Sequence, residues 1–202
     1  MQSFSLVWRY LFPKAVLIVV MALPFGSVAA STPTETIKLA VDKVLMILKD
    51  ENLNRKQRWA EIGSIINTRF DFRSMSQSIL ATNWRSATAE EKRRFVDFFS
   101  QYLEDTYRTK IEAYTNQRVE YVGEQIRKDR ALVDTHILTN GTRIPVTFRL
   151  KNNDGAWYAY DVVIEGVSLV SNYRNTFNAI IKSEGMDGLL IDLEGRIAVY
   201  KE

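Results

Sequence analysis

Apolar residues recur at helical spacing in the first part of the chain. In TPTETIKLAVDKVLMILKDE, which starts at residue 32, the large aliphatic side chains fall at i, i+4, i+7, i+8 and i+11. This spacing predicts an amphipathic helix with Thr34 as its N-cap. A second helix is predicted to start at Asn54, and a short third helix to run from Asp71 to Leu80, because their apolar residues also return every three or four positions.

The clearest local signal lies in SATAEEKRRFVDFFSQYLEDTY. Thr88 and Glu91 have the spacing of a capping box, in which each side chain accepts a hydrogen bond from a backbone N–H of the first turn. Aromatic residues then repeat at helical spacing from Phe95 to Tyr102. A long helix ending near Tyr114 is therefore predicted.

From Arg118 the period falls to two. The segments RVEYVGEQ, RALVDTHILT, TRIPVTFRLKN and GAWYAYDVVIEG read as four strands joined by turn-forming residues. Pro145 cannot donate a ladder hydrogen bond, so the third strand is expected at a sheet edge or bulged there. After Gly166 the spacing is helical again, and a last short helix follows. The prediction is an α+β fold, a twisted antiparallel sheet of about four strands wrapped by N- and C-terminal helices.

The first 30 residues have the pattern of a secretory leader. Arg9 and Lys14 precede the apolar run AVLIVVMALPFG, and SVAAS offers a cleavage site between Ala30 and Ser31. The run is shorter than the roughly 20 residues that span a bilayer as a helix, although an uncleaved anchor remains an alternative. We expect residues 1–30 to be a cleaved signal peptide and residues 31–202 to form a single domain.

Charge and cysteine content narrow the class of protein. Two of the 27 basic residues lie in the leader, which leaves 25 bases against 24 acids and a net charge of +1. Such a balance does not favour a nucleic-acid partner. The chain has no cysteine, so no disulfide and no thiol nucleophile are available. An exported protein of this kind fits a bacterial periplasm.

Candidate catalytic groups are sparse. His136 is the only histidine, and on a strand it shares a face with Asp134, without an identifiable nucleophile. Asp161 and Glu165 lie four residues apart on a strand, about 13 Å along it, and we expect them to face solvent or to pair with Arg143 or Arg149. One histidine and no cysteine disfavour a metal site. No catalytic residue and no metal ligand are predicted.

Three segments together resemble a known family. FDFRSMSQSIL, NWRSATAEEKRRFVDFFSQYLEDTY and YDVVIEGVSLVSNYRNTFNAIIKSEGMDGLL are similar to the MlaC, or toluene-tolerance, family of periplasmic phospholipid-binding proteins. They occur in order and, with the segments between them, cover nearly the whole of residues 31–202.

The resemblance implies a shuttle that moves glycerophospholipids between the outer and inner membranes and so maintains outer-membrane lipid asymmetry. Its implied partners are an outer-membrane lipoprotein–porin complex and an inner-membrane ABC transporter complex with a periplasmic lipid-transfer subunit. The implied fold buries the acyl tails between sheet and helices and leaves the headgroup in water. No cofactor is expected, because the bound phospholipid is cargo.

An apolar cavity between sheet and helices would hold the tails, and two tails require one larger than the 300–1,000 Å³ of ordinary ligand pockets. Tyr173 is expected to pack on the tails, and Arg174 either to meet a phosphate or to remain a solvated helix charge. Periodicity describes a dense core equally well, so a structural envelope module and an exported enzyme using His136 and Asp134 stay open. The predicted wall consists of Phe72, Met75, Ile79, Tyr102, Val146, Phe148, Leu150, Tyr160, Val162, Ile164, Val167, Val170 and Tyr173.

Overall fold

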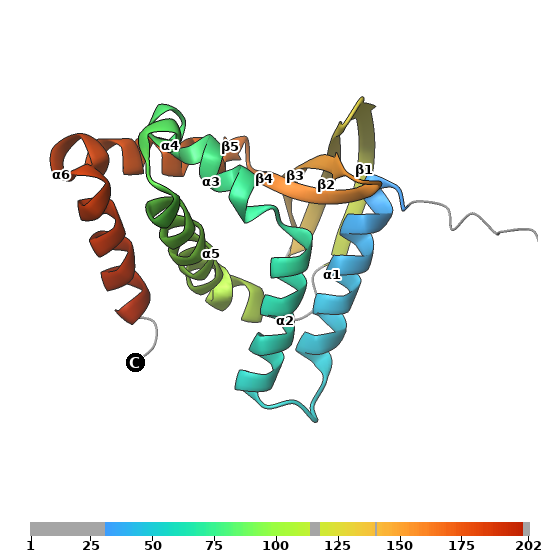
Figure 1. Cartoon of the computed structure of the whole chain (residues 1–202). Helices are drawn as coiled ribbons and strands as arrows, with labels where there is room; N and C mark the ends of the chain where they lie inside the picture. Colours follow the sequence, from blue (N-terminus) through green and yellow to red (C-terminus); the bar gives the residue numbers. More distant parts are fainter. Residues whose placement is uncertain (1–30, 114–117, 140, 200–202) are drawn as a thin grey trace, which may run out of the picture.

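The computed structural model describes residues 31–113, 118–139 and 141–199. The helices before the sheet are α1 (Pro33–Lys49), α2 (Arg55–Arg69), α3 (Phe72–Leu80), α4 (Thr82–Ser86) and α5 (Ala89–Glu112) (Figure 1). The strands are β1 (Arg118–Arg127), β2 (Arg130–Thr139), β3 (Thr142–Asn153), β4 (Ala156–Ile164) and β5 (Val167–Ser168), and α6 (Leu169–Val199) follows them. The predicted α+β fold is confirmed.

Capping boxes start three of the helices, because a side-chain oxygen there satisfies a backbone N–H that has no partner within the helix. The predicted capping box at Thr88 and the predicted start of the second helix at Asn54 are confirmed, and Asn54 is the N-cap of α2. The N-cap of α1 is Thr32 rather than the predicted Thr34. Thr32 is followed by Pro33, which suits the first helical position. The Thr32 hydroxyl oxygen accepts the backbone N–H of the N3 residue, Glu35, and the Thr32 backbone N–H donates to the Glu35 carboxylate.

The sheet is antiparallel throughout and its strands lie in chain order, β1-β2-β3-β4-β5. The four predicted strands are confirmed, and the two-residue β5 joins them. The expectation that β3 lies at an edge or bulges at Pro145 is wrong, because β3 lies between β2 and β4. The missing N–H is tolerated because β4 pairs with β3 only from Val146 onward, and the Pro145 carbonyl still accepts the N–H of Glu165 at 2.9 Å.

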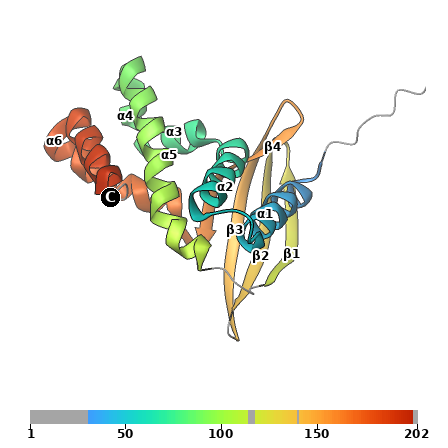
Figure 2. The ribbon, with the colours of Figure 1, turned by 90° about the horizontal axis from the view of Figure 1, so that it is seen from below.

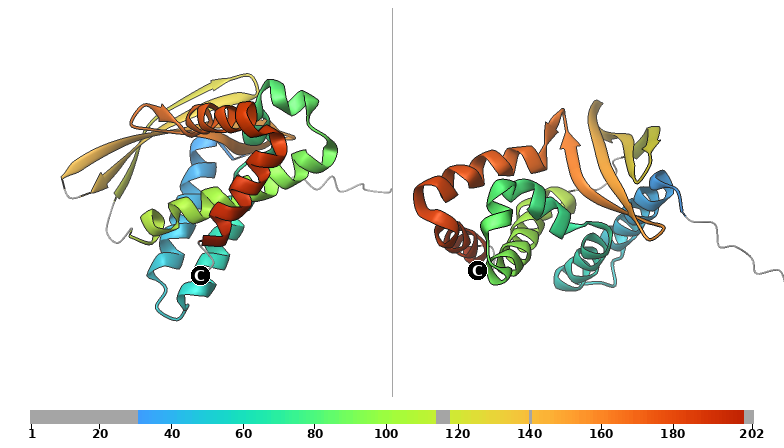
Figure 3. Two further views of the ribbon diagram at one scale, coloured as in Figure 1. Left: turned by 90° about the vertical axis from the view of Figure 1, so that its left-hand side faces the viewer. Right: turned by 45° about the horizontal axis from the view of Figure 1, so that its top comes forward.

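The α1–α2 hairpin lies along one face of the sheet, and α3 to α6 gather beyond α2 near β4 (Figures 1 and 2). α6 changes direction at Gly185 (Figure 3). The φ of Gly185 is 74°, a backbone conformation that residues other than glycine rarely adopt. This break agrees with the predicted last short helix. No helix in the described part of the chain is long and apolar enough to span a bilayer.

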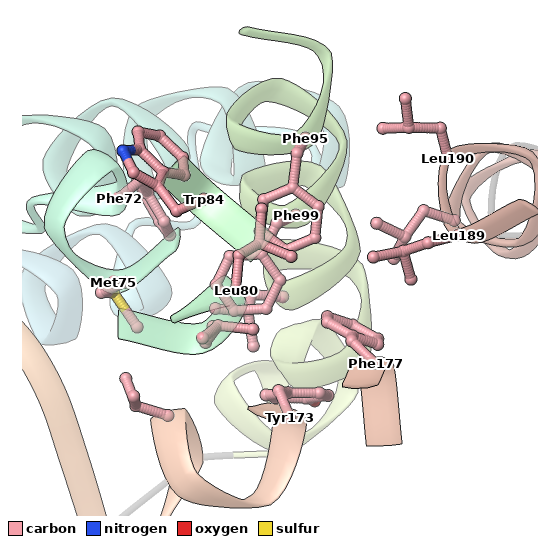
Figure 4. Packing of buried hydrophobic residues seen from close by; sticks show 14 residues of the cluster. Phe72, Met75, Leu80, Trp84, Phe95, Phe99, Tyr173, Phe177, Leu189 and Leu190 are labelled. Atoms are coloured by element: carbon pink, nitrogen blue, oxygen red, sulfur yellow. The ribbon is translucent and has the colours of Figure 1, made fainter. Parts of the chain in front are cut away.

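The buried apolar side chains form three separate clusters. The largest lies among α3, α5 and α6, where the rings of Phe99, Tyr173 and Phe177 converge at centroid distances of 5.5–6.0 Å (Figure 4). A second joins the start of α1, at Ile37, to β2, β3 and β4. A third holds the α1–α2 hairpin together around Trp59. The α1–α2 hairpin therefore has its own core and does not depend on filling the space between itself and the sheet.

Candidate functional site

A cavity of about 560 Å³ lies between the inner face of the sheet, the α1–α2 hairpin and the last turns of α5. Its lining is mostly apolar. α1 contributes Ile37, Ala40, Val41, Val44, Leu45 and Leu48. The sheet contributes Val119, Thr135, Ile137, Thr139, Ile144, Val146, Phe148 and Ile164. The end of α2, the end of α5 and the residue after β4 contribute Ile65, Ile66, Arg69, Phe70, Tyr107, Lys110, Ile111 and Glu165.

The two walls follow from the two periodicities of the sequence. Alternate residues of a strand share one face of the sheet, and residues three or four apart share one face of a helix. Thr135 is the one almost fully buried residue among those that line this cavity whose side chain carries a hydroxyl. Its hydroxyl donates a hydrogen bond to the carbonyl of Val146 at 2.8 Å. The Thr135 hydroxyl therefore needs no polar ligand atom, and the sheet side of the cavity offers mainly hydrocarbon surface.

The cavity is smaller than expected, because its volume falls inside the 300–1,000 Å³ range that it was predicted to exceed. The reason lies in the helices. The aromatic side chains of α3, α5 and α6 pack against one another, and α3 and α6 contribute no residue to the lining of this cavity. Only the hairpin and the end of α5 remain to form the second wall.

Three of the residues predicted for the wall line the cavity: Val146, Phe148 and Ile164. Val162 is buried on the same face of β4, and Leu150 belongs to the cluster beneath the start of α1. Val167 is 57% exposed. The rest lie in or against the cluster among α3, α5 and α6: Phe72, Met75, Ile79, Tyr102, Tyr160, Val170 and Tyr173. The structure thus places α1 and α2 at the cavity, where the prediction had α3 and α6.

Tyr173 packs within this helical cluster, 5.8 Å from the ring of Tyr102 and 5.5 Å from that of Phe99. Burial raises the pKa of Tyr173 well above its usual value, and the neighbouring hydroxyls of Tyr107 and Tyr102 raise it further. The hydroxyl therefore stays protonated at neutral pH. Tyr107 lies between this group and the cavity, since its side chain lines the cavity.

Asp161 joins the sheet to α6. The residue is 2% exposed, and its carboxylate accepts hydrogen bonds from the Val170 N–H at 3.1 Å, the Ser168 hydroxyl at 2.7 Å and the Arg149 guanidinium at 3.2 Å. The Ser168 oxygen in turn accepts the N–H of Ser171. The predicted pairing with Arg149 is confirmed, but the carboxylate is buried. Its role at this junction is structural, because a carboxylate at a helix N-terminus satisfies free N–H groups and the helix dipole.

Arg174 neither faces the cavity nor stands free in solvent. Its Nε donates to the carbonyl of Ser78 at 2.8 Å, which ties α6 to α3. Both alternatives considered for this residue are therefore corrected. The sequence contains no local signal for the contact, because it joins segments 96 positions apart.

The candidate acid–base pair lies on the other face of the sheet. Asp134 and His136 alternate with Thr135, which lines the cavity, so their side chains point away from it. Asp134 accepts the hydroxyl of Thr147 at 2.6 Å. Within the described residues, no group of three or more His, Cys, Asp or Glu side chains is arranged to hold a metal ion.

Comparison with known proteins agrees with this geometry. A sequence model of the family described as "MlaC protein" matches residues 38–195. The toluene tolerance protein ttg2D of Pseudomonas putida is 26% identical over 183 residues, covering 86% of this chain and 84% of that protein. The intermembrane phospholipid transport system binding protein MlaC of Haemophilus influenzae is 22% identical over 179 residues, covering 83% of each chain.

A solved structure has the same fold. The phospholipid-binding protein from Ralstonia solanacearum, determined in complex with a phospholipid, superposes with a TM-score of 0.75 at 29% sequence identity. The match covers 83% of this chain and 97% of that one.

Proposed function

The chain belongs to the MlaC family, and on that premise we propose that it is a phospholipid-binding transport protein that holds the acyl tails of its cargo between the α1–α2 hairpin and the sheet. The observation that carries the proposal is the cavity itself. Two walls of apolar side chains face each other across about 560 Å³ in a fold whose relative from Ralstonia solanacearum was solved with a phospholipid.

The physical need for a carrier follows from the solubility of the tails. At about 0.8 kcal/mol per buried methylene, two tails with about 30 methylenes are held in a membrane by about 25 kcal/mol. Crossing water unaided is therefore very slow. A carrier replaces this burial with its own apolar wall, and attraction of this kind is non-directional and proportional to area.

The size of the cavity suggests how loading occurs. Because 560 Å³ is modest for two tails, we propose that the hairpin moves away from the sheet as lipid enters. The hairpin tip is bound to the rest of the protein by the Arg55–Glu112 ion pair at 2.8 Å. Its two other ends are bonded to the sheet, through Thr34 to Glu124 and Asp71 to Ala159.

The enzyme alternative is not favoured. The MlaC family is one of lipid-binding transport proteins rather than enzymes, and Asp134 and His136 lie on the sheet face opposite the cavity. A structural module with a closed core is not favoured either, since the core is divided around an open apolar space.

The proposal also covers the compartment and the partners of the protein. We place residues 31–202 in the periplasm as a shuttle between an outer-membrane lipoprotein–porin complex and an inner-membrane ABC transporter complex. Support comes from the Haemophilus influenzae relative, which is named for an intermembrane phospholipid transport system. The proposed signal peptide, residues 1–30, lies outside the described residues.

Extraction of the purified protein with organic solvent, followed by mass spectrometry, tests the function. We expect glycerophospholipid in near-stoichiometric amount. Protein that is free of lipid, and that also takes none up from phospholipid vesicles, would contradict the proposal. A His136→Ala variant provides a control for the enzyme alternative, because the proposal predicts unchanged lipid content and transport.

A further inference from the structure

Three charged side chains line the mostly apolar cavity: Arg69, Lys110 and Glu165. None of them forms an ion pair or a hydrogen bond with another side chain in the described part of the chain. Two cations and one anion give the lining a net positive charge.

Arg69 is the most constrained of the three. It is the last residue of α2 and is half-buried beside Ile66 and Phe70, which also line the cavity. The backbone just after it is bonded to the sheet, where the Asp71 N–H donates to the Ala159 carbonyl at 2.8 Å. The guanidinium therefore starts from a rigid end of the hairpin, and not from its tip.

An unpaired guanidinium in this position requires an explanation. A cation is favoured near a helix C-terminus, but that preference is equally satisfied by a side chain that points into water. Two arginines of α2 and α5 do have carboxylate partners: Arg55 pairs with Glu112 at 2.8 Å and Arg108 with Asp105 at 2.7 Å. Removing a cation from water without a counter-ion is costly, so an anion that enters the cavity would relieve this cost at Arg69.

Lys110 and Glu165 are less constrained. Lys110 is exposed on α5, and its ammonium lies 5.4 Å from the centre of the Tyr107 ring. Glu165 is exposed in the turn after β4. An ammonium is a compact charge, whereas a guanidinium presents a planar fork of donors that matches two oxygens of a phosphate. Arg69 is thus better suited than Lys110 to fix the position of a phosphoryl group.

We propose that Arg69 binds the phosphodiester of the bound lipid and thereby makes this carrier select phospholipids over uncharged lipids with the same tails. This inference rests on the proposed function, because the tails must occupy the cavity for their phosphate to reach its lining. Apolar burial supplies most of the affinity but does not distinguish a phospholipid from a diacylglycerol. A charged contact does, since the uncharged lipid leaves the guanidinium without a partner.

The test is a competition between two lipids that differ only in the phosphate headgroup. Delipidated protein is loaded from detergent micelles that contain equal amounts of dioleoyl phosphatidylglycerol and dioleoylglycerol, and the bound lipids are measured by mass spectrometry. Arg69→Met removes the charge at similar length, and Arg69→Lys keeps the charge without the fork. Arg127→Met, an exposed arginine on β1 that does not line the cavity, is the matched control.

The wild-type protein is expected to prefer phosphatidylglycerol. Arg69→Met should lower the ratio of bound phosphatidylglycerol to diacylglycerol by about 10- to 100-fold, the usual effect of a hydrogen bond to a charged group. Its total lipid content should stay near that of the wild type. Arg69→Lys should fall between them, and Arg127→Met should match the wild type. Arg69→Gln replaces Arg69→Met if the latter does not fold.

Several outcomes would overturn the inference. An Arg69→Met protein with the wild-type ratio removes the role of Arg69, and an equal loss in Arg127→Met assigns the effect to overall charge. Inorganic phosphate in millimolar excess distinguishes binding of a lipid headgroup from binding of a free anion. If phosphate raises the melting temperature of the wild type but not of Arg69→Met, and leaves the ratio of bound lipids unchanged, the site binds free phosphate instead. Wild-type protein that binds neither lipid would contradict the proposed function itself, which is a distinct result.

Discussion

Placing a carboxylate in the wall of the cavity at Val146 is the sharpest test of how the cavity works. Val146 is 5% exposed, lines the cavity from β3 and pairs with Ile164 of β4. The hydrogen bond from Thr135 goes to the backbone carbonyl of Val146, so a Val146→Glu substitution preserves it. The new side chain extends into the cavity, where water can solvate it in the empty protein and acyl chains would cover it in the loaded one.

The size of the effect follows from the cost of neutralising that carboxylate. An ionised carboxyl group against hydrocarbon escapes most of its desolvation by taking up a proton. From an ordinary glutamate pKa of about 4.3, protonation at pH 7 costs about 1.4 kcal/mol per pH unit, or about 4 kcal/mol. Lipid binding at pH 7 should therefore weaken by about 1,000-fold.

The same reasoning gives a pH dependence with a definite sign. Lipid raises the pKa of the introduced carboxyl group, so the penalty is absent below the pKa of the empty protein and grows as the pH rises above it. At pH 5 the cost should fall to about 1 kcal/mol. The affinity of the variant should thus recover by about 100-fold between pH 7 and pH 5.

The assay is a fluorescence displacement titration with phosphatidylglycerol at both pH values, with circular dichroism to verify the fold. Val146→Gln is the matched control, because its amide has a similar shape and does not titrate. It should bind weakly with the same affinity at both pH values. A folded Val146→Glu protein that binds lipid like the wild type at pH 7, or whose pH dependence equals that of Val146→Gln, would refute the reasoning.

Three further predictions concern the framework around the cavity. Asp161→Ala should lower the free energy of unfolding in urea by about 2–3 kcal/mol, because the buried N–H of Val170 loses its acceptor; a loss below about 1 kcal/mol would show that water replaces the carboxylate. Thr88→Ala should cost about 1 kcal/mol through loss of the cap, measured by thermal unfolding, and an unchanged Tm would count against the capping box. Burial raises the pKa of Asp71, but the hydrogen bond and charge of Lys151 help to hold it below its usual value. The stabilisation that results is complete above the ordinary pKa of an aspartate and is lost as the pH falls through the lowered pKa. Lys151→Met should therefore unfold at a higher pH than the wild type in an acid titration, and an unchanged midpoint would contradict this.

The chain's local features were predictable because their causes are local. A capping box needs residues three positions apart, and the prediction for Thr88 and Glu91 is confirmed. The correct N-cap of α1, Thr32 instead of Thr34, could also have been predicted locally. Thr32 and Glu35 have the spacing of a capping box, and Pro33 occupies the first helical position. The turns and the strand order likewise follow from short-range patterns, as antiparallel neighbours are joined by tight turns.

Periodicity along the chain is enough to say which face of each element is apolar, but which of those faces meet depends on how the elements pack. The stripe on α1 and the stripe from Phe95 on α5 have the same period, yet the first lines an open cavity and the second closes against α6. Apolar attraction depends on area and not on direction, so periodicity names no partner. The aromatic rings of α5 and α6 fit edge to face, whereas the aliphatic rows of the hairpin and the sheet stand apart and leave room for a ligand.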